Sequence, residues 1–172
     1  YKGNTILPLI IAEACQKKNV YLLHMGTGCI FYGTAPDGQA WTEEDHANPS
    51  AVYTRCKYGA DLALSKLANV GIARIRMPID CISHPANLLD KLSKYSKVVD
   101  VENSLTVVED MIDVFHQLLE KKAEGVFHVT NPGSIKHKEI LEMYKKYVNP
   151  DHDNEWISEE DLVKMGLADK KR

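Results

Sequence analysis

Two periodicities of hydrophobic residues divide the chain into predicted helices and strands. Apolar residues at helical spacing predict helices over residues 5–17, 50–67, 86–95 and 135–147. Thr106 and Glu109 form a capping box, the S/T-x-x-E pattern of a helix start, which predicts a further helix that ends near Lys122. Short apolar runs predict strands over residues 20–25, 72–77, 98–101 and 126–130. Glycine and proline punctuate residues 32–49, which we expect to be a surface loop. Strands that alternate with helices indicate an α/β fold with a mostly parallel sheet.

Composition narrows the class of protein. The 172 residues suit one domain of ordinary size, and 44% hydrophobic with 26% charged residues is typical of a globular protein with a packed core. The formal net charge of -3 gives no electrostatic case for nucleic-acid binding. The longest apolar run, Ile6–Ala12, is interrupted by Pro8 and is too short for a membrane span. No signal peptide is visible, so we expect a cytoplasmic protein.

The cysteines and histidines point to neither a disulfide framework nor a metal centre. The four cysteines form no C-x-x-C pair, which argues against a zinc knuckle and a thioredoxin motif. Reduced thiols are favoured over two disulfides because no secretory segment is visible. No pair of histidines has metal-ligand spacing with a carboxylate partner, so we expect no bound metal.

Tyr53 and Lys57 are the sharpest chemical feature of the sequence. They are four residues apart on a predicted helix and therefore share one face. An ammonium beside a phenol stabilises the phenolate and lowers the tyrosine pKa, so such a tyrosine can exchange a proton with a substrate oxygen. The Y-x-x-x-K spacing alone often arises by chance, and a solvent-exposed pair on a helix is the alternative interpretation.

Thr27 adds context to this pair. It follows the buried strand predicted over residues 20–25, and residues just past the carboxyl end of a strand line the ligand crevice of α/β sheets. Its hydroxyl can donate to the same substrate oxygen as Tyr53; alternatively, Thr27 is a turn residue between two glycines. Those glycines are not a phosphate loop, because the third glycine of G-x-G-x-x-G would fall at Phe31.

These residues and their surroundings resemble the extended short-chain dehydrogenases. Thr27, Tyr53 and Lys57 match the Thr/Ser–Tyr–Lys triad of that family. Within the family the chain is similar to dTDP-4-dehydrorhamnose reductases, and most closely to bifunctional UDP-4-keto-6-deoxyglucose 3,5-epimerase/4-reductases of nucleotide-rhamnose synthesis. The matching segments are Thr27-Gly28-Cys29-Ile30-Phe31, Arg74-Ile75-Arg76-Met77-Pro78-Ile79, Asn131-Pro132-Gly133 and His137–Tyr144.

The resemblance implies roles in reduction for five residues. Thr27 and Tyr53 would bind the C4 keto oxygen of the substrate, and Tyr53 would protonate it. Lys57 would hold the nicotinamide ribose and tune Tyr53. Pro78 and Ile79 would lie with Tyr53 and Lys57 at the cofactor, which the resemblance implies to be NADPH or NADH.

The resemblance also implies an epimerase pair and substrate contacts. Cys29 and Lys91 match the two residues that handle epimerisation, in which a proton beside a ketone is removed and returned on the other face. From the residues alone, a small buried thiol and an exposed helix lysine explain this pair as well. Gly28 and Asn87 would contact the substrate, together with Thr27 and Cys29.

Three departures from the family pattern change what we expect. His84-Pro85-Ala86-Asn87 stands where the family usually has Asn-Pro-Arg-Asn, which removes an arginine contact to the substrate. Residues 32–40 are shorter than the usual loop, so the lid over the sugar is expected to differ. The chain begins at Tyr1 inside a predicted helix and ends before the family's Asn-containing tail. The dinucleotide-binding βαβ units, on the order of 80–100 residues, are expected upstream, so the fragment alone is expected to be inactive.

Fold, domains and function follow from the resemblance as expectations. The chain would be the C-terminal part of a Rossmann-like, doubly wound parallel sheet with a small substrate-binding subdomain. Residues 1–80 would carry the catalytic residues, and residues 81–172 would form mainly the substrate-binding subdomain with returning sheet elements. The expected activity is NADPH-dependent reduction, with 3,5-epimerisation, of a UDP- or dTDP-linked 4-keto-6-deoxy-hexose to nucleotide-L-rhamnose.

Two alternatives stay open. An NAD-retaining nucleotide-sugar epimerase or dehydratase has no need of the Cys29–Lys91 pair. A non-catalytic regulatory subunit, like the β-subunit of methionine adenosyltransferase, shares the fold, although an intact triad counts against it. The sequence does not choose between UDP and dTDP or between NADPH and NADH. The oligomeric state is also open, and pairing through a helix such as residues 50–67 would give a homodimer, as in many family members.

Overall fold

The computed structural model describes residues 1–166 of the chain, which form two compact units. Unit 1 consists of residues 1–76 and 109–130. Unit 2 consists of residues 77–108 and of the described chain from Asn131 onward. Each unit is therefore built from two separate segments of sequence. The functional division at residue 80 stays a prediction.

Unit 1 contains a three-stranded parallel sheet in the order β1-β2-β7. The strands are β1 (Leu22–Thr27), β2 (Val70–Ile75) and β7 (Gly125–Val129). Thr27 pairs with Ile75, and Ile75 pairs with Val129, so the three strands end together. In open α/β sheets, ligands bind outside the carboxyl ends of the strands. Thr27 stands at that edge.

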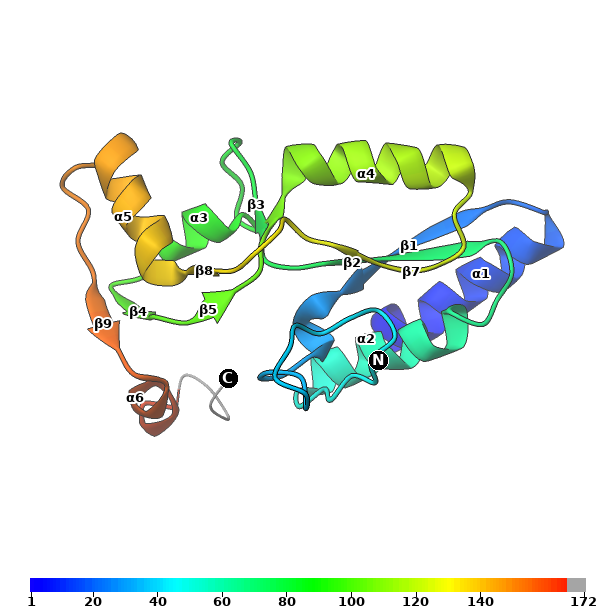
Figure 1. Ribbon diagram of the computed structural model, residues 1–172, viewed down its shortest axis with the longest axis horizontal. Coiled ribbons are helices and arrows are strands. Elements are labelled where there is room, and N and C mark those ends of the chain that lie inside the picture. Colours follow the sequence, from blue (N-terminus) through cyan, green and yellow to red (C-terminus); the bar gives the residue numbers. More distant parts are fainter. Residues whose placement is uncertain (167–172) are drawn as a thin grey trace. The chain divides into compact units, whose positions relative to one another are not determined.

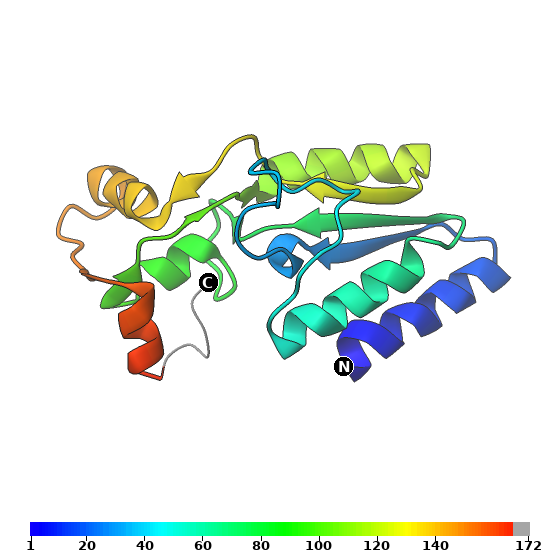
Figure 2. The ribbon, with the colours of Figure 1, turned by 60° about the horizontal axis from the view of Figure 1, so that its bottom comes forward.

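Helices cover both faces of this sheet (Figures 1 and 2). A π-helical turn η1 (Lys2–Ile6), α1 (Leu7–Lys17) and α2 (Val52–Leu64) lie on one face, and α4 (Val108–Lys121) lies on the other. The first face buries Ala12, Ala60, Leu64, Val70 and Ile72, and the second buries Ala73, Leu118 and Val129. Because β2 packs on both faces, its sequence is a nearly continuous apolar run. The predicted α/β class is confirmed.

Several element ends differ from the sequence prediction. The strand expected over residues 20–25 begins at Leu22, because Asn19 (φ 53°) ends α1 in a left-handed turn that short polar residues tolerate. The helix expected over residues 50–67 spans only Val52–Leu64. Thr106, expected to start a helix, lies instead in a short strand just before α4.

Unit 2 is made of short elements. Its helices are α3 (Leu88–Leu92), α5 (His137–Tyr147) and α6 (Glu159–Lys164). Its strands pair as β3 (Pro78–Ile79) with β6 (Thr106–Val107), β4 (Lys97–Val99) with β9 (Glu155–Ile157), and β5 (Glu102–Asn103) with β8 (Ile135–Lys136). The first two pairs are parallel and the third is antiparallel. The core of this unit consists of Leu88, Leu92, Val98, Ile140 and Leu141.

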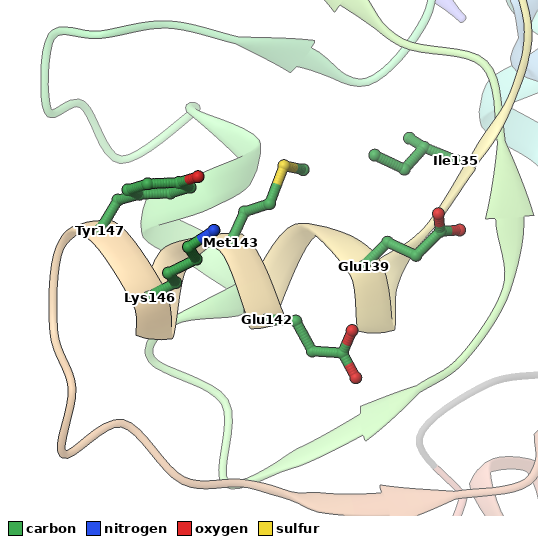
Figure 3. A pocket seen from close by; sticks show the side chains of 6 residues that line it. All are labelled: Ile135, Glu139, Glu142, Met143, Lys146 and Tyr147. Atoms are coloured by element: carbon green, nitrogen blue, oxygen red, sulfur yellow. The ribbon is translucent and has the colours of Figure 1, made fainter.

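One open hollow of unit 2 lies along α5 and beside Ile135, the first residue of β8 (Figure 3). Its lining side chains are Ile135, Glu139, Glu142, Met143, Lys146 and Tyr147. None of the site residues predicted from the sequence is among them. Within residues 1–166, no helix is both long and apolar enough to cross a membrane.

Gly71 is a position in β2 where the fold requires glycine. A Cβ added there would lie 2.6 Å from the backbone oxygen of Ala123 and would also clash with the hydroxyl of Tyr21, which donates to that same oxygen. We expect Gly71→Ala to lower the free energy of unfolding by roughly 1–3 kcal/mol, as overpacking does. Chemical denaturation of the full-length protein measures this. Gly59→Ala is the control, because its Cβ would make only an ordinary 3.6 Å contact with Thr5, and an equal loss there would contradict the argument.

Candidate active site

Thr27 organises the turn at the carboxyl end of β1. Its side chain is buried, and its Oγ1 accepts a hydrogen bond from the backbone N–H of Cys29 at 3.2 Å. This bond caps the 3₁₀ turn η2 (Gly28–Ile30) and so fixes Gly28 and the half-buried Cys29. Because the Thr27 oxygen is the acceptor, the bond leaves its hydroxyl proton available for a ligand oxygen.

Helix α2 carries Tyr53 and Lys57 and packs against η2, so five of the predicted residues gather in unit 1. Tyr53 stands in the first turn of α2 with 52% of its surface exposed. The predicted lowering of the Tyr53 pKa by Lys57 is wrong. Burial raises the pKa of Tyr53, and the neighbouring Cys29 raises it further. The phenol is therefore held in its protonated form.

Lys57 points to the sheet. Its Nζ donates to the backbone oxygen of Met25 at 2.7 Å, which explains why it does not tune Tyr53 in this structure. Burial lowers the pKa of Lys57, while the carboxylate of Asp61 opposes that shift. An ammonium has three N–H donors, so the bond to Met25 leaves two for a ligand.

A buried ion pair stands behind Lys57. Arg74 Nε lies 2.6 Å from Asp61 Oδ2, and the two side chains are 5% and 3% exposed. Arg74 Nη1 also lies 3.2 Å from Nε2 of His128, and its guanidinium lies over the ring of Phe31 at 5.4 Å. Since a guanidinium only donates, His128 accepts through Nε2 and is neutral in this arrangement. Burial is the main cause that lowers the pKa of His128, in agreement with a neutral ring.

The loop after β1 connects to the opposite strand of the sheet. Phe31 stacks on Trp41 with ring centroids 5.0 Å apart, and Trp41 Nε1 donates to the oxygen of Gly33 at 2.7 Å. Glu43 Oε1 accepts the backbone N–H of His128 in β7 at 2.7 Å. The loop therefore joins the two outer strands, β1 and β7, of the described sheet.

The remaining predicted site residues lie in unit 2. Pro78 and Ile79 form β3, and Lys91 is exposed on α3. Asn87 is buried at the N-cap of α3, where its Oδ1 accepts from the backbone of Asp80 and Leu89 and its Nδ2 donates to the oxygens of Asp80 and Ile82. These four bonds fill the capacity of the amide. A substrate contact by Asn87 stays a prediction that this geometry does not favour.

Sequence reasoning missed the charged residues behind the triad. Asp61, Glu43 and His128 were not singled out, and Arg74 was named only within a segment that matches the family. A signal was present, because Arg74 interrupts an otherwise apolar strand and a buried charge requires a partner. Asp61 lies one helical turn beyond Lys57 on the same face of α2, which is where such a partner can be found.

The fold and the site together define the class of protein. A threonine at the carboxyl end of a parallel strand, followed by a tyrosine and a lysine one turn apart on the next helix, is the arrangement expected of short-chain-dehydrogenase-type α/β proteins, and the Rossmann-like fold matches. The chain belongs to the family described as the RmlD substrate binding domain, whose model matches residues 1–149.

Known proteins of this kind are similar to the chain. Over 149 residues it is 36% identical to the trifunctional UDP-glucose 4,6-dehydratase/UDP-4-keto-6-deoxy-D-glucose 3,5-epimerase/UDP-4-keto-L-rhamnose-reductase RHM3 of Arabidopsis thaliana. The aligned segment covers 83% of this chain and 22% of that protein. Its sequence is also 34% identical to that of the L780 UDP-rhamnose synthase of Acanthamoeba polyphaga mimivirus. The crystal structure of that protein matches the fold of this chain with a TM-score of 0.87, over 94% of this chain and 58% of that one. The dTDP-4-dehydrorhamnose reductase of Bacillus anthracis, solved with NADP, shares the fold at 22% identity, with a TM-score of 0.78 over 92% of this chain and 58% of that one. The chain thus spans only part of each relative.

The hydrogen bond between Glu43 and the backbone of His128 holds the loop to β7 and can be tested. Burial alone would raise the Glu43 pKa, but hydrogen bonds, above all from the backbone N–H of His128, outweigh it and lower that pKa. We expect Glu43→Ala to speed hydrogen exchange of the His128 amide by roughly tenfold or more, since a hydrogen bond to a charged group contributes about 1.5–3 kcal/mol. Because the folded pKa lies below the unfolded one, the wild-type protection should hold at neutral pH and fall as acid protonates Glu43.

Exchange measured by NMR in the full-length protein checks both effects. Glu44→Ala is the matched control, because Glu44 is exposed on the same loop. Equal exchange rates at His128 in the Glu43 and Glu44 variants would show that the loop is held by other contacts.

Proposed function

We propose that the full-length protein containing this chain reduces a nucleotide-linked 4-keto-6-deoxy-hexose, with 3,5-epimerisation, to nucleotide-L-rhamnose. The observation that carries this proposal is the grouping of Thr27, Cys29, Tyr53 and Lys57 where η2 packs against α2. The rhamnose-synthesis activities in the names of its relatives, the L780 UDP-rhamnose synthase and RHM3, support the same substrate class.

The residues present fit the nicotinamide end of a dinucleotide cofactor. Lys57 keeps two N–H donors beyond its bond to Met25, enough for the paired hydroxyls of a ribose. When bound, NADPH or NADH supplies the hydride that reduces the C4 ketone. The glycine-rich pyrophosphate loop is not among these 172 residues, so we place the activity in the full-length protein.

In the proposed mechanism, Thr27 and Tyr53 hold the C4 oxygen of the substrate. Thr27 is fixed by the N–H of Cys29 and offers its hydroxyl proton to that oxygen. Tyr53 donates the proton that converts the developing alkoxide to an alcohol, and its raised pKa suits a group that must arrive protonated. Two aligned donors at an oxygen that gains charge lower the barrier.

The same two donors serve the proposed epimerisation. Removal of a proton beside the C4 ketone places negative charge on the same oxygen, so Thr27 and Tyr53 stabilise the enolate as well. Cys29, whose backbone the Thr27 cap fixes, is one proposed proton-transfer group. Lys91, which is exposed on α3, is the second residue proposed for epimerisation.

A regulatory subunit of the same fold and an NAD-retaining epimerase or dehydratase are the competing functions. A regulatory subunit has no use for a buried threonine that keeps its hydroxyl proton available, or for a protonated phenol in the first turn of α2. An NAD-retaining enzyme returns its cofactor unchanged and so consumes no NADPH over a full turnover.

Replacing the proton donor tests the reductase proposal. We expect Tyr53→Phe to lower the rate of NADPH oxidation by roughly 10²–10⁴-fold, the usual contribution of a general acid. The assay follows NADPH and NADH oxidation by the full-length protein with UDP- and dTDP-4-keto-6-deoxyglucose. Tyr58→Phe is the matched control, because Tyr58 lies on the same helix and its hydroxyl accepts from the backbone N–H of Ala47 in the loop. Wild-type protein that oxidises neither cofactor with either sugar would point to the regulatory alternative.

The identity of the sugar product tests the epimerase proposal. We expect Cys29→Ala to stop formation of the rhamnose product while reduction of an already epimerised 4-keto-rhamnose continues, because the Thr27, Tyr53 and Lys57 groups remain. NMR of the purified sugar product distinguishes the two epimers. Cys56→Ala, a change of a second half-buried thiol on α2, serves as control. A Cys29→Ala protein that still makes rhamnose would leave this thiol with a packing role.

A further inference from the structure

We infer that Asp61 is a positioning residue for Lys57: its carboxylate, held by Arg74, is the counter-charge that keeps the Lys57 ammonium in place beside β1. This inference rests on the proposed function, because Lys57 is the residue proposed to hold the cofactor ribose. Asp61 itself touches neither cofactor nor substrate in this scheme.

The geometry places both charges at the same point of β1. Lys57 and Asp61 are one helical turn apart on α2 and share a face. Lys57 Nζ donates to the oxygen of Met25 at 2.7 Å. Asp61 Oδ1 lies against the next residue, since a Cβ added to Gly26 would be only 3.2 Å from it. The ammonium and the carboxylate therefore reach consecutive residues of one strand.

Arg74 prevents Asp61 from turning away. It holds Oδ2 at 2.6 Å, and its own Cγ would lie 3.1 Å from a Cβ on Gly26. The other oxygen, Oδ1, is buried and has no hydrogen-bond partner within the described residues. A buried carboxylate oxygen without a hydrogen bond is costly, so a folded protein retains it where a nearby charge compensates. Lys57 provides that second positive charge.

The charges around Lys57 show that Asp61 is its main support. On α2 it faces Asp61, and on β1 it faces His24; Arg74 and His128 act on Asp61 in turn. The pKa of His24 is lowered to about 4, first by burial and then by Lys57, so this ring is neutral. Burial lowers the pKa of Lys57 as well, and the charge that opposes this shift is that of Asp61.

Removing the Asp61 charge tests the inference directly. In the full-length protein we expect Asp61→Asn to lower the Lys57 pKa by roughly one unit, the effect of losing an opposite charge at close range. NMR of ¹³C-dimethylated lysines measures this pKa, with Lys57→Arg to assign the signal. Since Lys57 is charged below its pKa, the alkaline limb of the kcat/KM profile should move to lower pH by the same amount.

Three further variants separate positioning from folding. Asp61→Glu keeps the charge and should return the alkaline limb of the kcat/KM profile to its wild-type pH. Asp113→Asn, a change of an exposed carboxylate on α4, should leave the Lys57 pKa unchanged. If the unpaired Arg74 prevents Asp61→Asn from folding, Asp61→Asn with Arg74→Met removes the pair together and should still lower the Lys57 pKa, though less. An unchanged Lys57 pKa in a folded variant overturns the inference.

The two proposals fail in different ways. A lowered Lys57 pKa in Asp61→Asn, together with wild-type protein that oxidises no NADPH, supports the positioning role and rejects the reductase. NADPH oxidation with an unchanged Lys57 pKa supports the reductase and rejects the role of Asp61.

Discussion

The buried ion pair between Asp61 and Arg74 joins helix α2 to the middle strand of the sheet, and the site depends on it. Taking two charges out of water is expensive, and breaking such a pair on one side typically destabilises a protein by about 3–5 kcal/mol. The contacts of the pair offset this desolvation cost. Arg74 also reaches His128 on β7 and the ring of Phe31, so one guanidinium links a helix, two strands and the loop.

The chemistry is divided between rigid backbone and adjustable side chains. Thr27 is fixed by the turn that it caps, whereas Tyr53 is half exposed at the start of α2 and free to meet a ligand. Lys57 donates one of its N–H groups to the backbone oxygen of Met25 in β1. The site thus combines two groups that the fold holds, Thr27 and Lys57, with a tyrosine whose final position a bound molecule can still adjust.

The sequence predicted the elements of unit 1 and the helices α3 and α5 of unit 2, but it missed most of the short strands of unit 2, for a physical reason. Long apolar periods revealed α1, α2, α4 and the three parallel strands, with ends shifted by a few residues. Two- and three-residue strands such as β3 and β6 have no period to detect, because pairing between distant segments creates them. Tyr53 and Lys57 were found by spacing on one helix. The Lys57–Met25 bond and the Asp61–Arg74 pair depend on which strand lies beside that helix, which spacing alone does not reveal.

The contact between Glu43 and the backbone of His128 also bears on solubility. In the described part of the chain, β7 is an outer strand, and the outward N–H groups of such a strand can recruit the strand of another molecule. A carboxylate that accepts one of these groups removes a pairing site and adds a negative charge that opposes stacking of like copies. The same residue that anchors the loop therefore protects a sheet edge against edge-to-edge aggregation.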